Sequence, residues 1–578
     1  MDRHEITRIL EEIGMLLELK GENFFKSKAY YDAARAIELM EEDIETLVAE
    51  GGLRKVKGFG EALTAKITEL VTKGRLEYYE KLKASIPEGL VEMLKIPGLG
   101  PKRVRTVHDS LGISTVEELK EACLSNRLAG LAGFGEKTQV KILEGIESLG
   151  RYSGQYLFPE AMALGSRLVE ALKESGLVIR CSEGGSLRRR KETVKDIDIL
   201  ASSSESARVM DCFTSHPLVS GIISKGDTKA SVTLVNGINV DLRVVEDSQY
   251  PYALHHFTGS REHNTAMRHL ARRSDLKMNE YGIFRGEEEE LVVCRSEEEI
   301  FRLFGMQYIP PELRENNGEL DAAMSGRLPE LLEPGDVKGV IHMHSSYSDG
   351  SGSLEDMVRA CISRGYSYMG ITDHSRTAVY AGGLKEDDIA RQHEEIRLLQ
   401  EKYPDFRIFR GIELEILSDG NIDYDEETLS SFDFTIASVH SATGMDEARM
   451  TERVIKAVQN RYVTILGHPT GRLLLSREGC KINMAEVINA AAAEKVIIEI
   501  NANPHRLDMD WRLCKSARDA GCKFVISPDA HSPEEIGNIK YGVNIARKGW
   551  LRACDVANAG SADAFAALTE EKRNKRSP

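Results

Sequence analysis

Hydrophobic residues follow different spacings in successive parts of the 578-residue chain. From Ile6 to about Leu82 they recur every three or four positions, which predicts a small all-helical domain. Beyond Gly154 the pattern is mixed, with a predicted helix at Phe158 to Ser175 and a predicted strand at Leu177 to Arg180. In the last part of the chain, short apolar runs alternate with helical stretches, which predicts a closed α/β barrel.

These patterns, together with the length, predict a multidomain protein of α+β and α/β class. We expect a helical domain at 1–85, a second helical region at 86–153, a mixed α/β region at 154–245, a small α/β subdomain at 246–315, a polar linker at 316–336, a barrel at 337–570 and a basic tail at 571–578. The linker is inferred from its polar composition and from Pro329 and Pro334.

Two carboxylates flank one apolar residue at the end of the stretch GSLRRRKETVKDID, residues 185–198. In an extended segment Asp196 and Asp198 point to one face, while Ile197 points into the core. A strand end with two solvated acids has the same pattern, but the preceding Gly-Ser and arginines favour two bridged Mg²⁺ ions with a triphosphate ligand. A hairpin around Asn236-Gly237 would add Asp241 as a third carboxylate.

Glycine-apolar-glycine turns precede three predicted helices, at Gly58 and Gly60, Gly98 and Gly100, and Gly133 and Gly135. The backbone N–H groups of such a turn and of the following helix can hold a phosphate oxygen without reading a base. A single turn of this kind is usually a helix connector. Three turns, the second followed by Lys102, resemble helix-hairpin-helix motifs that hold the DNA backbone.

The net charge of −16 argues against a nucleic-acid-binding protein, but basic residues cluster locally. Clusters lie at Lys102 to Arg105, at Arg188 to Lys191 and at Arg268 to Arg273. Nine cysteines without a CxxC pair indicate reduced thiols and a cytoplasmic protein. The N-terminus lacks an apolar signal core, and no apolar run approaches membrane-spanning length.

Residues with ligand chemistry lie at or just beyond the ends of the predicted barrel strands. They are His342, His344, Asp349, His374, Glu413, His440, His468, Asp529 and His531. A single histidine at a strand end is more often structural, but the active site of an α/β barrel gathers at that end. The set therefore predicts a metal centre, and imidazole with carboxylate admits Zn²⁺, Mn²⁺ or Fe²⁺.

The motifs GSLRRRKETVKDIDIL, VDLRVV and HHFTGSREHNTAMRHLARRSDLKMNEYGIF resemble, in order and spacing, the nucleotidyl-transfer core of family X DNA polymerases. The resemblance covers residues 1 to about 315. It implies a lyase-like domain at 1–85, a fingers-like region at 86–153, a palm at 154–245 and a nucleotide-selecting subdomain at 246–315. By this match Asp196 and Asp198 would bind two Mg²⁺ or Mn²⁺ ions. Asp241 would bind the catalytic ion and accept the primer 3'-OH proton, directly or through water.

The same resemblance implies further contacts. Nucleotide-binding positions would be Ser186, Arg189, Phe257, Gly259 and Asn264, and Arg268 would contact the template strand. His256 stands where vertebrate members carry a tyrosine, which leaves sugar discrimination open. Lys66 matches the Schiff-base lysine of the animal repair enzymes, and such a lysine must be partly deprotonated. Ala62 replaces one of their additional lysines, so lyase activity is an open alternative.

The C-terminal motifs HMHSSYSDG, TDHS, GIELEI, SVHS, GHPTGR and PDAHS resemble the polymerase and histidinol phosphatase (PHP) domain, a distorted seven-stranded barrel. The match covers about residues 337–570 and implies two to three divalent metals, Mn²⁺ or Zn²⁺, with Glu413 as a bridge. The metals would polarise a phosphodiester and lower the pKa of a bound water. Arg472, and more weakly His505 and Arg506, would contact the substrate phosphate.

Together these features predict a monomeric DNA-repair polymerase that fills short gaps from deoxynucleoside triphosphates. The second centre would act as a 3'-5' exonuclease and as an abasic-site endonuclease. The alternatives are a PHP-type phosphomonoesterase fused to a DNA-binding module, a DNA scaffold with two inert sites, and a nucleotidyltransferase acting on RNA or a small molecule. The last gives no role to three phosphate-holding turns.

Overall fold

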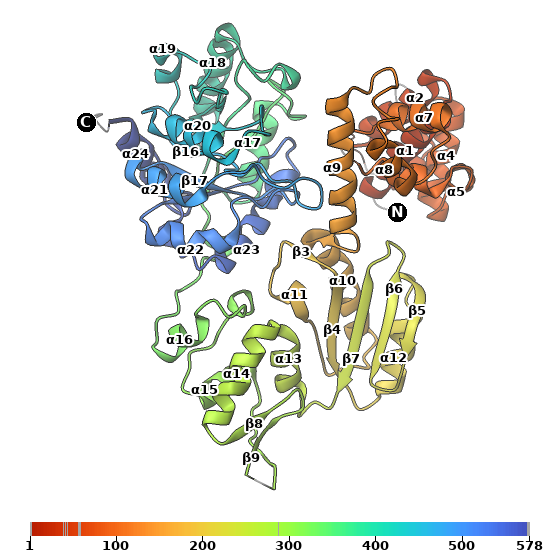
Figure 1. Ribbon diagram of the computed structural model, residues 1–578, viewed down its shortest axis with the longest axis vertical. Helices are drawn as coiled ribbons and strands as arrows, with labels where there is room; N and C mark the ends of the chain where they lie inside the picture. Colours follow the sequence, from red (N-terminus) through yellow and green to blue (C-terminus); the bar gives the residue numbers. More distant parts are fainter. Residues whose placement is uncertain are drawn as a thin grey trace. The chain divides into compact units, whose positions relative to one another are not determined.

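The computed structural model describes residues 3–38, 40, 42, 44–55, 59–96, 98–286 and 288–574 (Figure 1). The chain divides into two compact units, Met1–Ser153 and Gly154–Pro578. This division coincides with the change of hydrophobic pattern at Gly154.

The described residues of the first unit form only helices and their connections, as predicted. The helices are α1 (Arg3–Lys20), α2 (Phe24–Glu38), α3 (Ile44–Ala49), the 3₁₀ helix η1 (Gly52–Lys55), α4 (Glu61–Lys73), α5 (Glu77–Ala84), α6 (Glu88–Met93), α7 (Pro101–Leu111), α8 (Val116–Leu124) and α9 (Glu136–Tyr152). One cluster of buried apolar side chains extends from Ile6 to Ile146. The predicted segments 1–85 and 86–153 therefore share a core.

The glycine turns lead into α4, α7 and α9, whose N-caps are Gly60, Gly100 and Gly135. Gly98 and Gly133 each adopt φ +86°, in the left-handed region where L side chains are strained. No described atom lies within 4 Å of a Cβ built on either residue, so the backbone conformation rather than space requires glycine here. Gly58 of the first turn lies outside the described residues.

A mixed five-stranded sheet forms the centre of residues 154–245. Its order is β2 (Arg180–Glu183), β4 (Asp196–Ser202), β7 (Asn239–Val245), β6 (Lys229–Leu234) and β5 (Val219–Lys225), and only β4 and β7 pair in parallel. The strand predicted at Leu177 to Arg180 instead begins at Arg180. Helices α10 (Phe158–Glu174) and α12 (Ser206–Thr214) pack against each other and against the sheet, so they cover one face (Figure 1).

Residues 246–315 form a smaller subdomain with its own apolar cluster around Phe301. Its elements are α13 (Tyr250–Thr258), α14 (Arg261–Arg273), the antiparallel strands β8 (Leu276–Met278), β9 (Ile283–Arg285) and β10 (Glu290–Leu291), α15 (Glu297–Leu303) and η2 (Pro311–Leu313). Buried Glu297 lies between Arg188 and Arg314. This ion triad joins the subdomain to α11 (Gly185–Arg188).

The segment 316–336, predicted as a polar linker, is folded and packed. It contains α16 (Glu319–Met324) and η3 (Pro334–Asp336). Glu319 is fully buried, and its carboxylate lies 2.7 Å from His263 Nδ1. Leu331 and Leu332 are also buried. The polar residues that indicated a linker instead include a buried hydrogen-bonding partner for α14.

The C-terminal region contains parallel strands in two sheets. The first sheet is β11 (Gly339–Val340), β12 (Tyr368–Ile371) and β13 (Arg407–Arg410), and the second is β14 (Glu413–Glu415), β15 (Ile436–Ser438), β16 (Ile465–Leu466), β17 (Ile497–Asn501) and β18 (Phe524–Ser527). The predicted strand Phe406 to Glu415 is divided between β13 and β14. Isolated parallel bridges join Met343 to Ala530 and His374 to Glu413.

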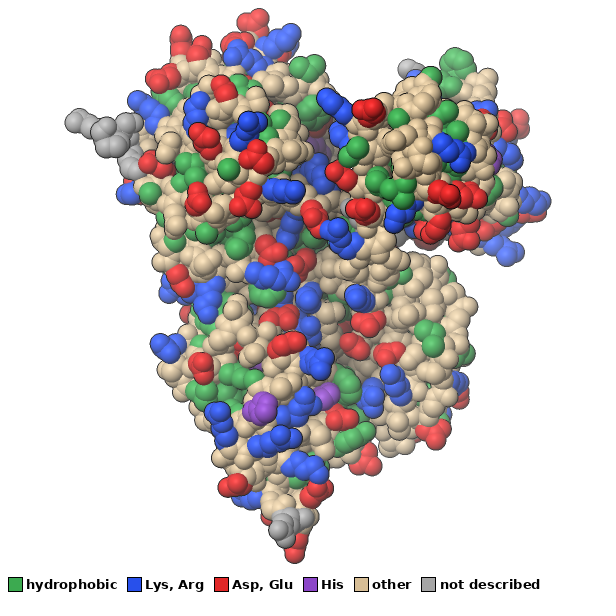
Figure 2. Space-filling model, viewed as in Figure 1, with side chains coloured by type: hydrophobic (Ala, Val, Ile, Leu, Met, Phe, Trp, Pro, Cys, Tyr) green, Lys and Arg blue, Asp and Glu red, His purple; other side chains and the backbone are tan. Residues whose placement is uncertain are grey.

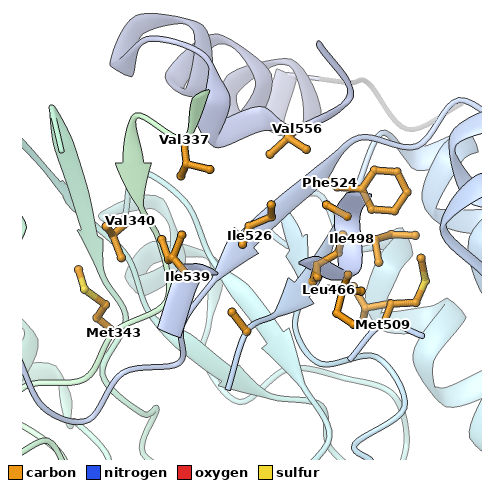
Figure 3. Close-up of a cluster of buried hydrophobic side chains, with 14 of the residues drawn as sticks. Val337, Val340, Met343, Leu466, Ile498, Met509, Phe524, Ile526, Ile539 and Val556 are labelled. Atoms are coloured by element: carbon orange, nitrogen blue, oxygen red, sulfur yellow. The ribbon is translucent and has the colours of Figure 1, made fainter. Parts of the chain in front are cut away.

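Helices lie between most of these strands, as the alternating pattern predicted. They are α17 (Leu354–Ser363), α18 (Glu386–Lys402), α19 (Glu426–Ser430), α20 (Glu447–Gln459), α21 (Met484–Glu494), α22 (Trp511–Asp519), α23 (Ile539–Lys548) and α24 (Ala562–Asn574). Figure 3 shows Val340, Ile498 and Ile526 in the cluster that packs strands against helices such as α23. The predicted basic tail at 571–578 begins inside α24, where Lys572 is buried, and residues 575–578 lie outside the described residues.

A second apolar cluster collects side chains from strands of both sheets. It includes Ile341, Tyr368, Phe409, Phe434, Ile436, Ile465, Ile497 and Val525. Phe565 of α24 is fully buried in it, with ring contacts to Tyr368, Phe409 and Phe434. The two sheets therefore share an interior that α24 covers.

Polar contacts hold the C-terminal region against the rest of the second unit. Glu192 accepts a hydrogen bond from Trp511 Nε1 at 3.2 Å and pairs with Arg512 at 2.9 Å. Buried Lys548 donates to the Arg189 carbonyl and to Glu315. Trp550 packs into the cluster around Phe301.

The Glu297 triad yields a stability prediction. Burial alone would raise the pKa of Glu297, but Arg314 and Arg188 outweigh it and hold the pKa at about 2. Breaking a buried ion pair costs about 3–5 kcal/mol, so Glu297→Gln should lower the urea midpoint of unfolding at pH 7. The folded-state pKa lies below the ordinary value of 4.5, so this stabilisation is present above that pH and is lost toward pH 2.

The deficit of Glu297→Gln should therefore shrink between pH 7 and pH 3. Glu298→Gln is the matched control, because Glu298 is exposed on the same helix. Equal deficits for both variants at pH 7 would contradict the role of the triad.

Candidate metal centres

The first candidate centre lies on the face of the mixed sheet opposite α10 and α12. Asp198 on β4 is the register partner of Asp241 on β7. Asp196 is exposed and Ile197 fully buried, as the alternation predicted. Parallel pairing in this register brings the third carboxylate beside the other two.

Repulsion among these acids is only partly relieved by the protein. Burial, together with the charges of Asp196 and Asp241, raises the pKa of Asp198 to about 6. The pKa of Asp196 is also raised, by the partial loss of solvent around its carboxylate and by Asp241. Burial would raise the pKa of Asp241 too, but hydrogen bonds from Lys229, at 2.8 Å, and Ser231 lower it. Lys229 thus neutralises only one member of the trio.

Gly185 allows the Gly-Ser turn to approach Asp198. It adopts φ +55°, and a Cβ built on it would lie 2.0 Å from Asp198 Oδ2. The Gly184 N–H donates to the Asp198 carbonyl at 2.8 Å. Glycine is therefore required both for the backbone conformation and for the space. Ser186 follows on α11 and is half-buried.

The predicted nucleotide-binding residues lie around the acids but already have partners. Arg189 pairs with Glu315 at 3.0 Å, and Asn264 Nδ2 donates to the His256 carbonyl at 2.6 Å. Gly259 is in close contact with Asn264, since an added Cβ would meet Asn264 Oδ1 at 2.5 Å. Phe257 lines a cavity of about 40 Å³ together with Asp198, Asp241 and Lys229. Of the predicted set, Phe257 shares this cavity with the acids, and the charge of Arg189 acts on Asp198.

Basic side chains gather on the surface over α13 and α14 (Figure 2). Arg268, His269, Arg272 and Arg273 are all exposed on α14. In the first unit, Lys102 is exposed on α7, with Nζ 5.3 Å from the Phe24 ring centroid. These positions leave Arg268 and Lys102 accessible to a phosphate backbone.

Lys66 lies on α4 beside two tyrosines. Its Nζ donates to Tyr30 Oη at 2.7 Å and lies 4.2 Å from the Tyr78 ring centroid. Burial lowers the pKa of Lys66. This shift has the direction that Schiff-base chemistry needs.

The second candidate centre gathers the predicted ligands at one end of the C-terminal strands. Eight of them form three groups, and within each group the ligand atoms lie within 4.8 Å of one another. The groups are His344, Asp349, His374 and His531; His342, His344 and Asp529; and His374, Glu413 and His440. His468 Nε2 lies 3.0 Å from Glu413 Oε1. His344 and His374 belong to two groups each, and their ring centroids are 4.5 Å apart.

Glu413 is the electrostatic centre of this cluster. It is buried, with oxygens 3.0 Å from His374 Nδ1 and 3.3 Å from His440 Nε2. Burial opposes ionisation, but the surrounding imidazoles, His342 first, hold the pKa of Glu413 well below its ordinary range. A bridging position between metals requires such an ionised carboxylate.

Three partners of the ligands escaped the sequence reasoning. Glu499 lies 2.6 Å from His342 Nδ1 and Glu415 2.9 Å from His440 Nδ1, while Asn501 donates to Asp529 at 3.1 Å. Carboxylates on one ring nitrogen orient the other toward a metal. The available signal was their position as polar residues within the buried strands β14 and β17.

The residues present fit a multinuclear metal site. His342 Nε2 and both ring nitrogens of His344 are buried without a hydrogen-bond partner among the described residues. His342 and Asp529 adopt φ +66° and +52°, and such strained non-glycine conformations concentrate at functional sites. Unpaired donor atoms and strain are both expected where ligands are held for metals.

The three phosphate contacts expected beside this centre have different surroundings. Arg472 pairs with Asp510 at 2.7 Å and donates to the Arg506 carbonyl, so it supports the loop rather than facing the ligands. Arg506 Nε lies 3.4 Å from Asp529 Oδ2. His505 is exposed. Arg506 is therefore the basic residue that lies at the cluster.

Family models match separate stretches of the chain. They describe a helix-hairpin-helix domain (residues 1–76), a SAM-like helix-hairpin-helix tandem (90–148), the DNA polymerase beta thumb (253–315) and the PHP domain (341–503). All nine cysteines are free. Among the helices of the described residues, none combines the length and apolar character needed to cross a bilayer.

Three known proteins are similar over different spans. The DNA polymerase/3'-5' exonuclease PolX of Bacillus subtilis (strain 168) is 39% identical over 563 residues, 97% of this chain and 98% of that protein. A probable phosphatase of Thermoanaerobacter sp. (strain X514) is 27% identical over 233 residues, 37% of this chain and 93% of its own. The DNA-directed DNA/RNA polymerase mu of Homo sapiens is 40% identical over 78 residues, 13% of this chain and 16% of its own.

Because some histidines belong to two of the candidate ligand groups, substituting different ligands should remove different amounts of bound metal. His344→Ala removes a ligand from two groups, whereas His531→Ala removes a ligand from one. Metal content per chain, measured by inductively coupled plasma mass spectrometry after dialysis, should fall further in His344→Ala than in His531→Ala. His269→Ala, on exposed α14, is the control and should keep the wild-type content. Unchanged content in a folded His344→Ala would contradict the site.

Proposed function

This chain belongs to the bacterial PolX family of DNA polymerase/3'-5' exonucleases, and we propose that its two metal centres divide these activities between them. The carboxylates of the mixed sheet would add nucleotides to primer 3' ends at short gaps, and the C-terminal cluster would remove them. The observation that carries the proposal is two separate clusters of candidate metal ligands in one chain.

For nucleotide addition, Asp196 and Asp198 would hold two Mg²⁺ or Mn²⁺ ions, with Asp241 on the catalytic ion. When bound there, divalent metals neutralise the triphosphate and stabilise in-line displacement. Asp241 would accept the primer 3'-OH proton, directly or through water, and its lowered pKa keeps this carboxylate ionised. The raised pKa of Asp198 supports a cation requirement at this position.

The surrounding residues would orient substrates. Ser186, Arg189, Phe257, Gly259 and Asn264 would contact the nucleotide, with Arg189 and Asn264 exchanging their present partners for it. Arg268 would contact the template strand. The glycine turns at Gly60, Gly98, Gly100, Gly133 and Gly135, with Lys102, would hold DNA phosphates.

For removal of nucleotides, the clustered ligands would hold two to three divalent metals, Mn²⁺ or Zn²⁺, with Glu413 as a bridge. Metals bound there supply a Lewis acid for a phosphodiester and acidify a water. Glu499 and Glu415 would orient His342 and His440, and Arg506 would contact the phosphate. Isolated β-bridges join the two sheets, and both sheets contribute to one apolar interior. These features support a distorted seven-stranded barrel in which β13 and β14 count as one interrupted strand.

A second candidate activity is phosphomonoester hydrolysis by the C-terminal region. Similarity to a probable phosphatase over 37% of this chain favours it. Activity on histidinol phosphate without activity on a 3'-recessed duplex would select this reading. Abasic-site cleavage is a further proposed activity of the same centre.

The two-centre proposal predicts a clean separation of activities. Asp198→Ala should reduce extension of gapped DNA by at least about 10²-fold and leave degradation unchanged, because this carboxylate would hold the metal ions that stabilise the developing negative charge. His342→Ala should do the reverse. Labelled gapped DNA incubated with Mn²⁺ or Mg²⁺, with and without nucleotides, reports both activities. Loss of both extension and degradation in either variant would contradict the proposal that the two centres carry separate activities.

The amine of Lys66, which lies beside Tyr30 and Tyr78, predicts lyase activity of the first unit. Incubation with 5'-deoxyribose-phosphate DNA and borohydride should trap a covalent adduct that Lys66→Ala abolishes. Lys73→Ala, an exposed lysine on the same helix, is the matched control and should retain the adduct. Absence of any adduct, or an undiminished adduct in Lys66→Ala, would remove Lys66 from catalysis.

A further inference from the structure

An exposed aromatic side chain stands at the edge of the C-terminal metal centre. The 3₁₀ helix η4 (Val379–Ala381) carries Val379 and Tyr380, which are 82% and 73% exposed, while its other residue, Ala381, is buried. The Tyr380 ring centroid lies 6.1 Å from that of His374, at 57°. A large apolar surface therefore adjoins a ligand that two metal groups share.

This tip is fixed to the strand end that carries His374. The Leu384 N–H donates to the His374 carbonyl at 2.8 Å, and the Gly383 N–H donates to the Ala378 carbonyl at 3.1 Å. Gly382 has φ +70°, and a Cβ on Gly383 would lie 1.9 Å from the Ser375 carbonyl oxygen. Tyr380 is thus held at a set position relative to the ligands instead of on a free loop.

The chemistry of such a position indicates its ligand. A phosphodiester held at the metals carries a nucleobase a few ångströms away, and every base offers a π-face to an aromatic ring. One basic residue lies at these ligands to meet the phosphates: Arg506, whose Nε is 3.4 Å from Asp529 Oδ2. A small phosphomonoester has no nucleobase, so Val379 and Tyr380 would have no role in binding it.

We propose that Tyr380, supported by Val379, stacks on the nucleobase at the DNA 3' end and positions the terminal phosphodiester at the metal centre. The inference rests on the proposed 3'-5' exonuclease activity and names its substrate-binding residue. Stacking on Tyr380 requires the terminal base to leave the duplex. Unpaired and mismatched 3' ends should therefore be degraded faster than paired ends.

The test compares two single-stranded oligonucleotides that differ only at the 3' end, one with a terminal base and one with a terminal tetrahydrofuran abasic residue. Tyr380→Ala should raise KM for the first about 5- to 100-fold, with a smaller effect on kcat, because stacking contributes to binding. For the abasic oligonucleotide it should change neither. Tyr380→Phe, which keeps the ring, should behave as wild type.

Leu398→Ala is the control for loss of an exposed apolar side chain, since Leu398 is 50% exposed on α18. Metal content should be equal in all these proteins. Equal losses on both oligonucleotides, a loss in Tyr380→Phe like that in Tyr380→Ala, or no loss at all would each overturn the stacking role. Failure of the wild-type protein to degrade either oligonucleotide would instead refute the proposed exonuclease function.

Discussion

A carboxylate that is removed from water needs an opposite charge nearby. This constraint governs both candidate metal centres and the ion triad around Glu297. Glu297 receives two arginines from the chain itself and becomes a structural support. Glu413 is surrounded by imidazoles and remains ionised in the interior. Asp198 is partly buried and faces two other acids, while Lys229 pairs with Asp241, so the pKa of Asp198 rises to about 6. Where the protein supplies too little positive charge, metal ions are the natural complement.

The same principle connects parts of the second unit that are distant in sequence. Glu315 accepts from Arg189, the expected nucleotide contact, and from Lys548 of α23. Lys548 is buried, so none of its three polar contacts, to Arg189, Glu312 and Glu315, can be replaced easily by water. The polymerase-like region and the C-terminal region therefore meet through a shared ion network.

Local periodicity allowed the sequence to predict much of both candidate centres. Alternation in the strand placed Asp196 and Asp198 on one face, and strand ends indicated the histidines and Glu413. Contacts between remote segments carried no such signal. The packing of 316–336 includes a contact with His263 that the local sequence does not indicate. Which ligand a buried polar residue such as Glu499 contacts becomes visible only when the strands lie side by side. Arg472 lies near His468 in sequence, yet a partner 38 residues away, Asp510, determines its direction.

The contact between Glu192 and Trp511 has an optical consequence. The chain has two tryptophans, Trp511 and Trp550, and both lie where the C-terminal region meets the rest of the second unit. The first unit contains none. Emission excited beyond the tyrosine absorption band therefore arises only from this junction. Tryptophan fluorescence of the unmodified protein can therefore report whether the C-terminal region stays in contact with the rest of the second unit while DNA and nucleotides bind.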